Sequence, residues 1–139
     1  MWSPSAATPS TDRSTASQTP AGRSATCARL GTFAVTGNHE FFVGAPPWVT
    51  FLRKIGVDVL ENDRRTLGVG DTSYDVAGVP DFMAGRFGSD GAPTLADTLA
   101  GRDMTRAVIL QAHQPRQFDE AAALGVTLQL SGHTHGGQI

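Results

Sequence analysis

The chain has 139 residues, enough for one domain of ordinary size, and a formal net charge of −2 at pH 7. This charge, without a basic stripe, excludes nucleic acid as an implied partner. The single cysteine, Cys27, cannot form an internal disulfide, which fits a reducing compartment. No apolar run approaches the roughly 20 residues that a membrane-spanning helix needs.

Residues 1–29 differ from the rest of the chain in composition. Serine, threonine, alanine and proline dominate this segment, and apolar anchors are almost absent. Such a segment cannot bury enough apolar surface to offset the entropy that it loses on ordering. We therefore predict a disordered leader over residues 1–29 and a folded domain over residues 30–139.

The folded part is expected to begin with a strand and an amphipathic helix. The run Thr-Phe-Ala-Val-Thr at 32–36 predicts the strand. After two prolines, which suit the first turn of a helix, apolar residues follow with the spacing of one helical face. They are Trp48, Phe51, Leu52 and Ile55. We expect the helix to end at Gly56 and Trp48 to be a core aromatic.

The middle of the chain predicts short strands separated by turns. The strands are expected at residues 57–60, 64–67 and 74–79, with a turn at 70–75. Residues 80–106 are rich in proline, glycine and aspartate, which predicts a long loop with a short helix near 94–99.

The last part of the chain predicts a strand, a helix and a buried strand. The strands are expected at 107–111 and 126–130, and the helix near 117–124. Phe118, Ala121 and Ala122 are expected on the inner face of that helix.

The four histidines of the chain all follow segments that predict strands. They are His39, His113, His133 and His135. If strands 107–111 and 126–130 are parallel, their carboxyl ends meet at the edge where open α/β sheets place ligands. The histidines are therefore predicted to converge. The glycines at 132, 136 and 137 permit positive φ and close approach to a ligand, and the two imidazoles of His-x-His are expected to serve different ions.

Three strings resemble the calcineurin-like metallophosphoesterases. They are Gly-Asn-His-Glu at 37–40, His113 with Pro115 after it, and Gly-His-Thr-His at 132–135. The resemblance covers roughly residues 30–139 and is strongest to a bacterial branch that is often membrane-associated and linked to lipid head groups. A string such as Gly-Asn-His-Glu occurs by chance in on the order of one in a thousand chains this long, so the ordered set is specific.

The resemblance implies a site with two divalent metal ions. In such enzymes the ions lie about 3.5–4 Å apart, share a hydroxide and clamp the phosphate. By the same resemblance, His39 is the catalytic residue over the phosphate, and His135 is a ligand of the first ion. The implied ligands of the second ion are Asn38, His113 and His133. These donors do not distinguish manganese, iron and zinc.

Two acidic motifs of the family, Asp-x-His and Gly-Asp-x-x-Asp, should precede Gly37, where Asp12 is the only acidic residue. The Gly-Asp pair at 70–71 comes after Gly37, and its spacing to the next aspartate is one residue too long. Asp81 stands where relatives often have an acidic residue near the site, but it is more simply a loop residue. All four predicted ligands are neutral, so we expect this chain alone to bind at most one ion weakly and to lack appreciable phosphodiesterase activity.

The predicted fold class is α/β, a partial calcineurin-like phosphoesterase sandwich that lacks its first strands and its C-terminal strands. The favoured interpretation is an incomplete piece of a metal-dependent phosphoesterase. The alternatives are a catalytically inactive remnant that binds a metal or a partner, and an ordinary α/β domain whose histidines are loop residues. A further hypothesis is that another chain supplies the missing strands.

The implied substrate is a phosphate ester, and the resemblance to the bacterial branch adds a lipid head group as a candidate. Membrane association would come only from segments that this sequence does not contain. The expected location is the cytoplasm or the cytoplasmic face of a membrane.

Overall fold

The computed structural model describes residues 29–82, 84 and 94–137. The predicted disordered leader, except for Arg29, lies outside these residues. The elements, in chain order, are β1 (Thr32–Ala34), α1 (Asn38–Val43), α2 (Ala45–Lys54), β2 (Val57–Val59), β3 (Asp63–Leu67), η1 (Gly70–Thr72), β4 (Tyr74–Val79), α3 (Leu95–Leu99), β5 (Val108–Ala112), η3 (Pro115–Gln117), α4 (Phe118–Ala123) and β6 (Leu128–Leu130). None of the described helices is long and apolar enough to cross a bilayer.

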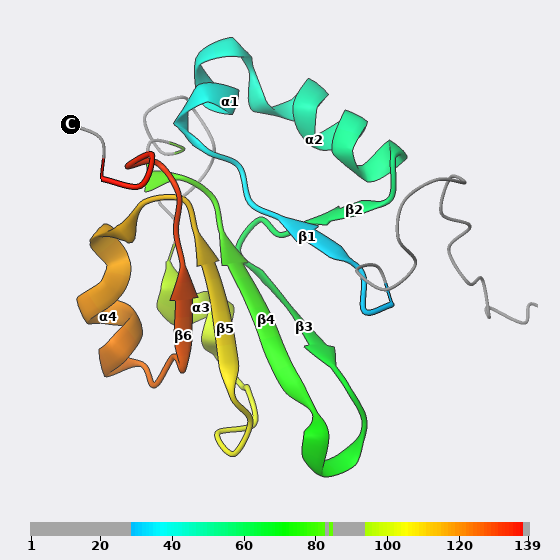
Figure 1. The fold of residues 1–139 in the computed structure, drawn as a ribbon, viewed down its shortest axis with the longest axis vertical. Helices are drawn as coiled ribbons and strands as arrows, with labels where there is room; N and C mark the ends of the chain where they lie inside the picture. Colours follow the sequence, from blue (N-terminus) through cyan, green and yellow to red (C-terminus); the bar gives the residue numbers. More distant parts are fainter. Residues whose placement is uncertain (1–28, 83, 85–93, 138–139) are drawn as a thin grey trace, which may run out of the picture.

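The strands form two sheets, which confirms the predicted α/β class (Figure 1). β1 and β2 pair in parallel, and the second sheet has the order β3-β4-β5-β6. In that second sheet β3 is antiparallel to β4, whereas β4, β5 and β6 run parallel to one another. The convergence of the histidines was predicted on the condition that the last two strands are parallel, and this condition is met, with Ile109 opposite Leu128.

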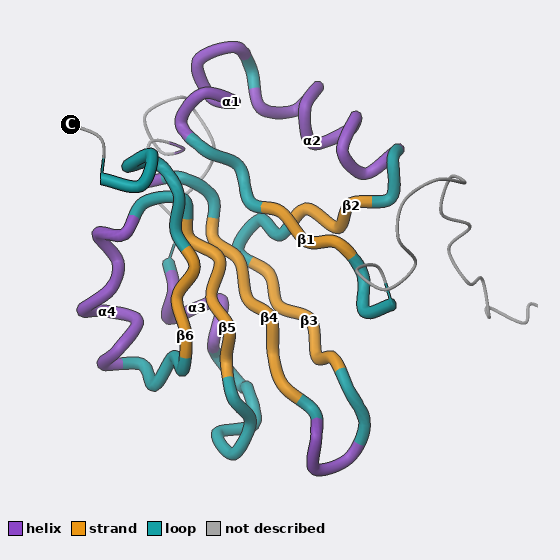
Figure 2. The backbone as a smooth tube through the Cα atoms, in the orientation of Figure 1, coloured by secondary structure: helices purple, strands orange, loops and turns teal. Residues whose placement is uncertain are grey.

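The core lies on the face of the larger sheet that α3 and α4 cover (Figure 2). β5 shows the alternation of a half-covered strand, because Val108, Leu110 and Ala112 are buried and the residues between them are partly exposed. The other buried members of this core are Ala77, Val79, Leu95, Leu99 and Ala121. Burying a large aliphatic side chain of this kind is worth roughly 1.5–3 kcal/mol, so this face stabilises the sheet.

A glycine lets the two sheets approach each other closely. A Cβ atom at Gly78 in β4 would lie 2.4 Å from the Cβ of Leu60 and 2.8 Å from Cγ1 of Val35. Leu60 is completely buried, and its backbone N–H donates to the carbonyl of Ala34 in β1 at 2.8 Å. The β1–β2 sheet therefore packs against β4 at a point where no side chain fits.

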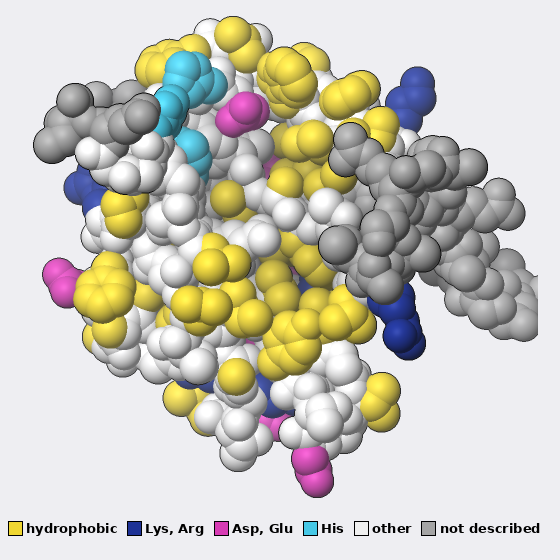
Figure 3. Space-filling model, viewed as in Figure 1, with side chains coloured by type: hydrophobic (Ala, Val, Ile, Leu, Met, Phe, Trp, Pro, Cys, Tyr) yellow, Lys and Arg dark blue, Asp and Glu magenta, His cyan; other side chains and the backbone are white. Residues whose placement is uncertain are grey.

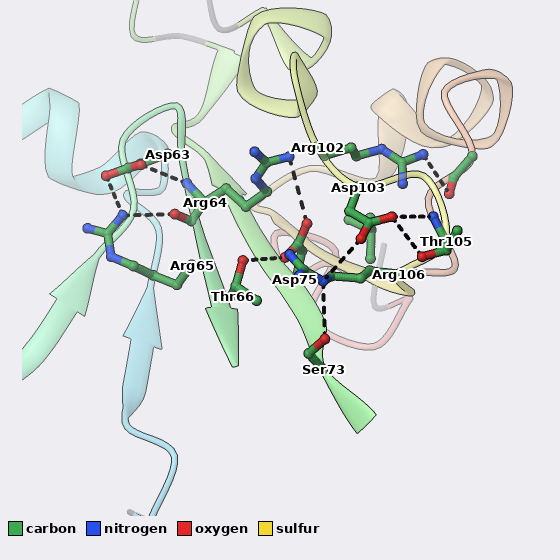
Figure 4. Close-up of polar contacts among 12 residues, drawn as sticks. Asp63, Arg64, Arg65, Thr66, Ser73, Asp75, Arg102, Asp103, Thr105 and Arg106 are labelled. Carbon is green, nitrogen blue, oxygen red and sulfur yellow. Dashed lines mark hydrogen bonds and ion pairs between the residues drawn. The ribbon is translucent and has the colours of Figure 1, made fainter. Parts of the chain in front are cut away.

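A buried carboxylate holds β3 against β4 (Figure 4). Asp75 is 1% exposed and accepts a 2.7 Å hydrogen bond from Oγ1 of Thr66 on β3. Nη1 of Arg64 lies 3.7 Å from the other carboxylate oxygen, close enough for an ion pair. The turn predicted at 70–75 is confirmed for its first part, which is η1 at Gly70–Thr72, whereas its last two residues belong to β4 and Asp75 serves the pairing with β3.

The predicted inner face of the first long helix is wrong. Trp48, Phe51 and Ile55 are 45%, 50% and 54% exposed, whereas α2 buries Ala45 and Val49. α2 packs on a sheet of only two strands, and such a small sheet covers only a narrow stripe of the helix. The helical spacing therefore located α2 correctly but not the residues that it buries.

Two predictions of burial near the end of the chain are also wrong. On α4 only Ala121 is buried, while Phe118 is 64% exposed and Ala122 is exposed too. The strand predicted to be buried, now β6, has Leu128 and Leu130 each 49% exposed. β6 is the outer strand of the described sheet and has a neighbouring strand on one side only, which leaves more of its side chains exposed. Figure 3 shows hydrophobic side chains spread over this face of the molecule.

We predict that Gly78→Ala destabilises the fold by about 1–3 kcal/mol, because overpacking forces Leu60 and Val35 aside. The measurement is urea denaturation followed by circular dichroism. Gly132→Ala is the control, since a Cβ there would lie 3.8 Å from the nearest atom, an ordinary contact distance. Equal midpoints for the two variants would contradict the proposed sheet contact.

Candidate metal centre

Three loops from distant parts of the chain meet at one edge of the sheets (Figure 1). β1 leads into Asn38 at the start of α1, β5 leads into His113, and β6 leads into the turn that carries His133. The histidine side chains visible in Figure 3 gather at this rim. The predicted convergence is therefore seen for the side chains of Asn38, His113 and His133.

The three side chains form a tight triangle of heteroatoms. Nε2 of His113 lies 2.9 Å from Oδ1 of Asn38, and Nδ1 of His133 lies 3.3 Å from the same oxygen. The two ring nitrogens are 3.2 Å apart. Ligands bound tetrahedrally to one ion with bonds near 2.1 Å are separated by about 3.4 Å, so this spacing fits a single metal ion.

With Oδ1 of Asn38 facing both rings, no pair of neutral imidazole tautomers makes all three contacts favourable. Each neutral imidazole nitrogen is either a donor or an acceptor, and Oδ1 of Asn38 can only accept. If both ring nitrogens donate to Oδ1, their hydrogens face each other and repel. If only one nitrogen donates, the lone pair of the other nitrogen faces the lone pairs of Oδ1 and repels them. A cation inside the triangle removes this conflict, because all three atoms can then direct lone pairs at it.

Gly37 packs tightly against the ring of His113, whereas Gly132 leaves ordinary space beside it. A Cβ atom at Gly37 would lie 2.8–3.0 Å from three atoms of that ring, and one at Gly132 would lie 3.8 Å from Nδ1. The N–H of Gly132 also donates to the carbonyl of His113 at 3.0 Å. Burial lowers the pKa of His113 below 6.5, and the nearby Asp81 carboxylate opposes this shift. The ring is therefore neutral near pH 7, as a metal ligand must be.

The Gly-Asn-His-Glu string begins a short helix that the sequence did not predict. α1 starts at Asn38, and the side chain of Glu40 accepts a 2.7 Å hydrogen bond from the N–H of Gly37. This bond satisfies one of the donors that a helix N-terminus leaves free. Glu40 thus has a structural role that holds Asn38 in place.

Asp81 lies close to His113 and His133, although a loop residue was the favoured interpretation of its position in the sequence. Among the described histidine, cysteine and acidic residues, the one group that could hold a metal ion is Asp81 with His113 and His133, whose ligand atoms lie within 4.8 Å of one another. Asp81 follows β4, the parallel neighbour of β5, so its loop opens at the same edge as that of His113. This adjacency is the signal that could have identified it, but strand order is not readable from the sequence.

The two other predicted site residues, His39 and His135, do not belong to this group. His39 is exposed, stacks edge-on against Phe42 with ring centroids 6.1 Å apart, and lowers the pKa of His113 through charge repulsion. His135 is exposed and, like His133, has a positive φ, 49° against 64°. The expectation that Gly132 supplies positive φ is wrong. Gly136 and Gly137 do so, and the two histidines themselves take the left-handed conformation.

An open cleft of about 290 Å³ begins at His113 and runs between β1 and the ends of β5 and β6. Its lining residues are Phe33, Ala34, Val35, Gln111, Ala112, His113, Leu130, Ser131 and Gly132. Most of these residues are apolar, whereas the polar groups of the centre lie at the end of the cleft that holds His113.

We predict that His113 titrates below 6.5 in the metal-free chain, because its ring is partly buried. When folding lowers the pKa of a histidine, the unfolded chain binds a proton at a higher pH than the folded chain does. The free energy of unfolding should therefore decrease as the pH falls below the unfolded-state pKa of about 6.5. The measurement is an NMR titration of the imidazole protons, assigned with His113→Gln. An apparent pKa above 6.5 would contradict the packing of the ring against Gly37.

The chain is similar to several curated metallophosphoesterases. It is 40% identical over 110 residues to an uncharacterized metallophosphoesterase of Helicobacter pylori strain J99, covering 78% of this chain and 28% of the relative. An uncharacterized metallophosphoesterase of Aquifex aeolicus is 41% identical over 110 residues, covering 79% of this chain and 41% of the relative. A bovine transmembrane protein with metallophosphoesterase domain is 37% identical over 122 residues, covering 81% and 28%.

The chain spans less than half the length of these relatives. No protein-family profile matches it, and no solved structure matches it. The identities of 30–41% to relatives that bear one family name nevertheless agree with the strings around Asn38, His113 and His133. The chain belongs to the metallophosphoesterase family.

Proposed function

We propose that the chain provides a divalent-metal site of a phosphoesterase that hydrolyses phosphoric esters. The triangle of Asn38, His113 and His133 is the main observation behind this proposal. Its three contacts are not all favourable as hydrogen bonds, whereas all three atoms can direct lone pairs at one cation. The family name of the relatives supports the phosphate-ester chemistry.

The residues present fit a first-row divalent ion. Imidazole nitrogens suit manganese, iron and zinc, and an amide oxygen completes the triangle. When bound, such an ion polarises a phosphoryl oxygen and lowers the pKa of a bound water toward neutrality. His39 lies beside the triangle at the start of α1, where a protonated imidazole would stabilise negative charge on the phosphate and donate a proton to the leaving oxygen.

His135 stays a proposed ligand of a neighbouring ion. It extends from the same turn as His133, and both residues hold the strained left-handed conformation that clusters at functional sites. Within the described part of the chain it joins no group of three ligands. We therefore expect one ion per chain at the triangle.

We predict that the chain binds one Mn²⁺ ion and that His113→Ala lowers the affinity at least about 100-fold, because one of three clustered ligands is lost. The measurement is the electron paramagnetic resonance signal of free Mn²⁺ during titration. Gln129→Ala, on β6 outside the triangle, is the control and should bind as the unaltered chain does. Equal binding by His113→Ala would remove the proposed site.

The phosphate chemistry requires a second measurement. We expect the Mn²⁺-loaded chain to bind inorganic phosphate, and we expect His39→Ala to weaken phosphate binding about 10-fold without changing Mn²⁺ binding. Calorimetry measures both. Metal binding without phosphate binding would favour the alternative of an inactive metal-binding module. Rapid hydrolysis of an aryl phosphodiester by the chain alone would contradict a centre with one ion.

We also predict that Gly37→Ala lowers the affinity for Mn²⁺ about 10-fold while the chain stays folded. The added methyl group would push the His113 ring away from Asn38, because it would lie 2.8–3.0 Å from the ring atoms. The measurement is the same titration, with circular dichroism as the check of the fold. Unchanged affinity would mean that the ring is not held against Gly37.

For the substrate, we propose a phosphate ester with a lipid head group, at the cytoplasmic face of a membrane. The support is that two relatives, bovine and zebrafish, are named transmembrane proteins with metallophosphoesterase domain. Competition against bound phosphate tests the proposal. Glycerophosphate should displace phosphate at lower concentration than a nucleoside monophosphate, and the reverse order would refute it.

A further inference from the structure

The backbone of Asp81 is pinned to the loop that carries Asn38. Its N–H donates to the carbonyl of Thr36 at 2.9 Å, and its own carbonyl accepts from the N–H of Ala84 at 2.8 Å. Thr36 and Asp81 are each 1% exposed. The loop after β4 and the loop after β1 are therefore joined two residues before Asn38, which fixes the Asp81 side chain relative to the triangle.

The carboxylate of Asp81 has the reach and the orientation of a ligand. Its ligand atom and those of His113 and His133 lie within 4.8 Å of one another. Ligands at tetrahedral separations lie about 3.4 Å apart, so a shift of about 1.5 Å or less brings the carboxylate into the same coordination sphere as the two imidazoles.

A neighbouring side chain orients this carboxylate. Nε2 of Gln114 donates to Oδ2 of Asp81 at 2.9 Å. Carboxylates that bind metal ions are usually held by such outer hydrogen bonds, which select one oxygen for the ion. Gln114 directly follows His113, so the loop after β5 positions one ligand and orients another.

We propose that Asp81 is the anionic ligand of the ion held by Asn38, His113 and His133, with Gln114 as its positioning residue. The inference rests on the metal site proposed above. The four residues together offer two nitrogens and two oxygens with one negative charge. This mixed set fits manganese, iron or zinc better than calcium, which takes 6–8 oxygen ligands.

A different role is conceivable for the same geometry, namely that Asp81 only orients His113 through its charge. Removing the carboxylate would weaken metal binding in both cases. Replacing it with a thiol separates them, because only a ligand at this position gives a bond between sulfur and metal.

The first test measures Mn²⁺ affinity of Asp81→Asn, which keeps the shape and an acceptor for Gln114 but removes the charge. We expect a loss of at least about 100-fold. Asp75→Asn is the matched control, since Asp75 is also 1% exposed but bonds Thr66 away from the centre. Its affinity should not change. Gln114→Leu should lose about 10-fold, as expected for an outer hydrogen bond.

The second test uses Asp81→Cys in a Cys27→Ser background, loaded with Co²⁺. We expect a thiolate-to-cobalt charge-transfer band in the near ultraviolet that Cys27→Ser alone lacks. Absence of the band in a variant that still binds Co²⁺ would overturn ligation by Asp81.

The outcomes separate the two proposals. If Asp81→Asn binds Mn²⁺ as tightly as the unaltered chain while His113→Ala does not bind, this inference fails and the metal site stands. If the unaltered chain binds neither Mn²⁺ nor Co²⁺, both fail. If Asp81→Asn does not fold, the charge-transfer band decides the question.

Discussion

The packing of the His113 ring against the backbone of Gly37 is the contact on which the rest of the centre depends. Any side chain at position 37 would begin within 3.0 Å of that ring. The ring is thus held where its Nε2 meets Oδ1 of Asn38, the next residue along the chain. Because Glu40 binds the N–H of Gly37, the turn that brings the two residues together is also fixed.

The fold delivers these groups through strand order. β4, β5 and β6 are parallel neighbours, so the loops carrying Asp81, His113 and His133 open at one edge. Asn38 comes from the other sheet, and its position depends on how closely β1 approaches β4. Gly78 permits that approach, and the bond from Asp81 N–H to the Thr36 carbonyl holds the loops together at the site. The contacts that join the two sheets therefore also position the groups of the metal centre.

The sequence predicted the parts of the fold that follow from local patterns. Apolar runs, helical spacing and turn residues located the strands, α2, α3 and α4. A helix between two strands also made their parallel pairing a natural condition, which β5 and β6 meet. Burial was harder to predict, because which face of α2 or β6 is covered depends on neighbouring layers. Trp48 and Leu128 show this clearly, since their apolar character says nothing about whether another layer is present.

The sequence likewise predicted part of the candidate site, namely its histidines, but not the contacts that depend on strand pairing. The histidines stood out because the residue type is rare and each follows a strand, and two of them do converge with Asn38. Asp81 was noted through the resemblance but interpreted as a loop residue, because aspartate is common in loops and its neighbours depend on the pairing of β4 with β5. α1 was not predicted, because its start depends on the hydrogen bond from the N–H of Gly37 to the Glu40 carboxylate. The three-residue spacing allows this bond but does not require it.

Charge balance decides how many ions the described residues can hold. Asp81 is the carboxylate in the ligand group, and Glu40 is engaged by the N–H of Gly37. Two unit charges 4 Å apart near a protein surface repel by about 4 kcal/mol, so two dications repel by roughly four times as much, about 16 kcal/mol. If Asp81 is a ligand, as proposed above, its carboxylate offsets half the charge of a single ion, which would make binding stronger than four neutral ligands would allow. Two dications beside Asp81 alone would keep three of their four positive charges uncompensated. We therefore infer that a second ion would have to be accompanied by further anionic groups, such as a hydroxide or the phosphate itself.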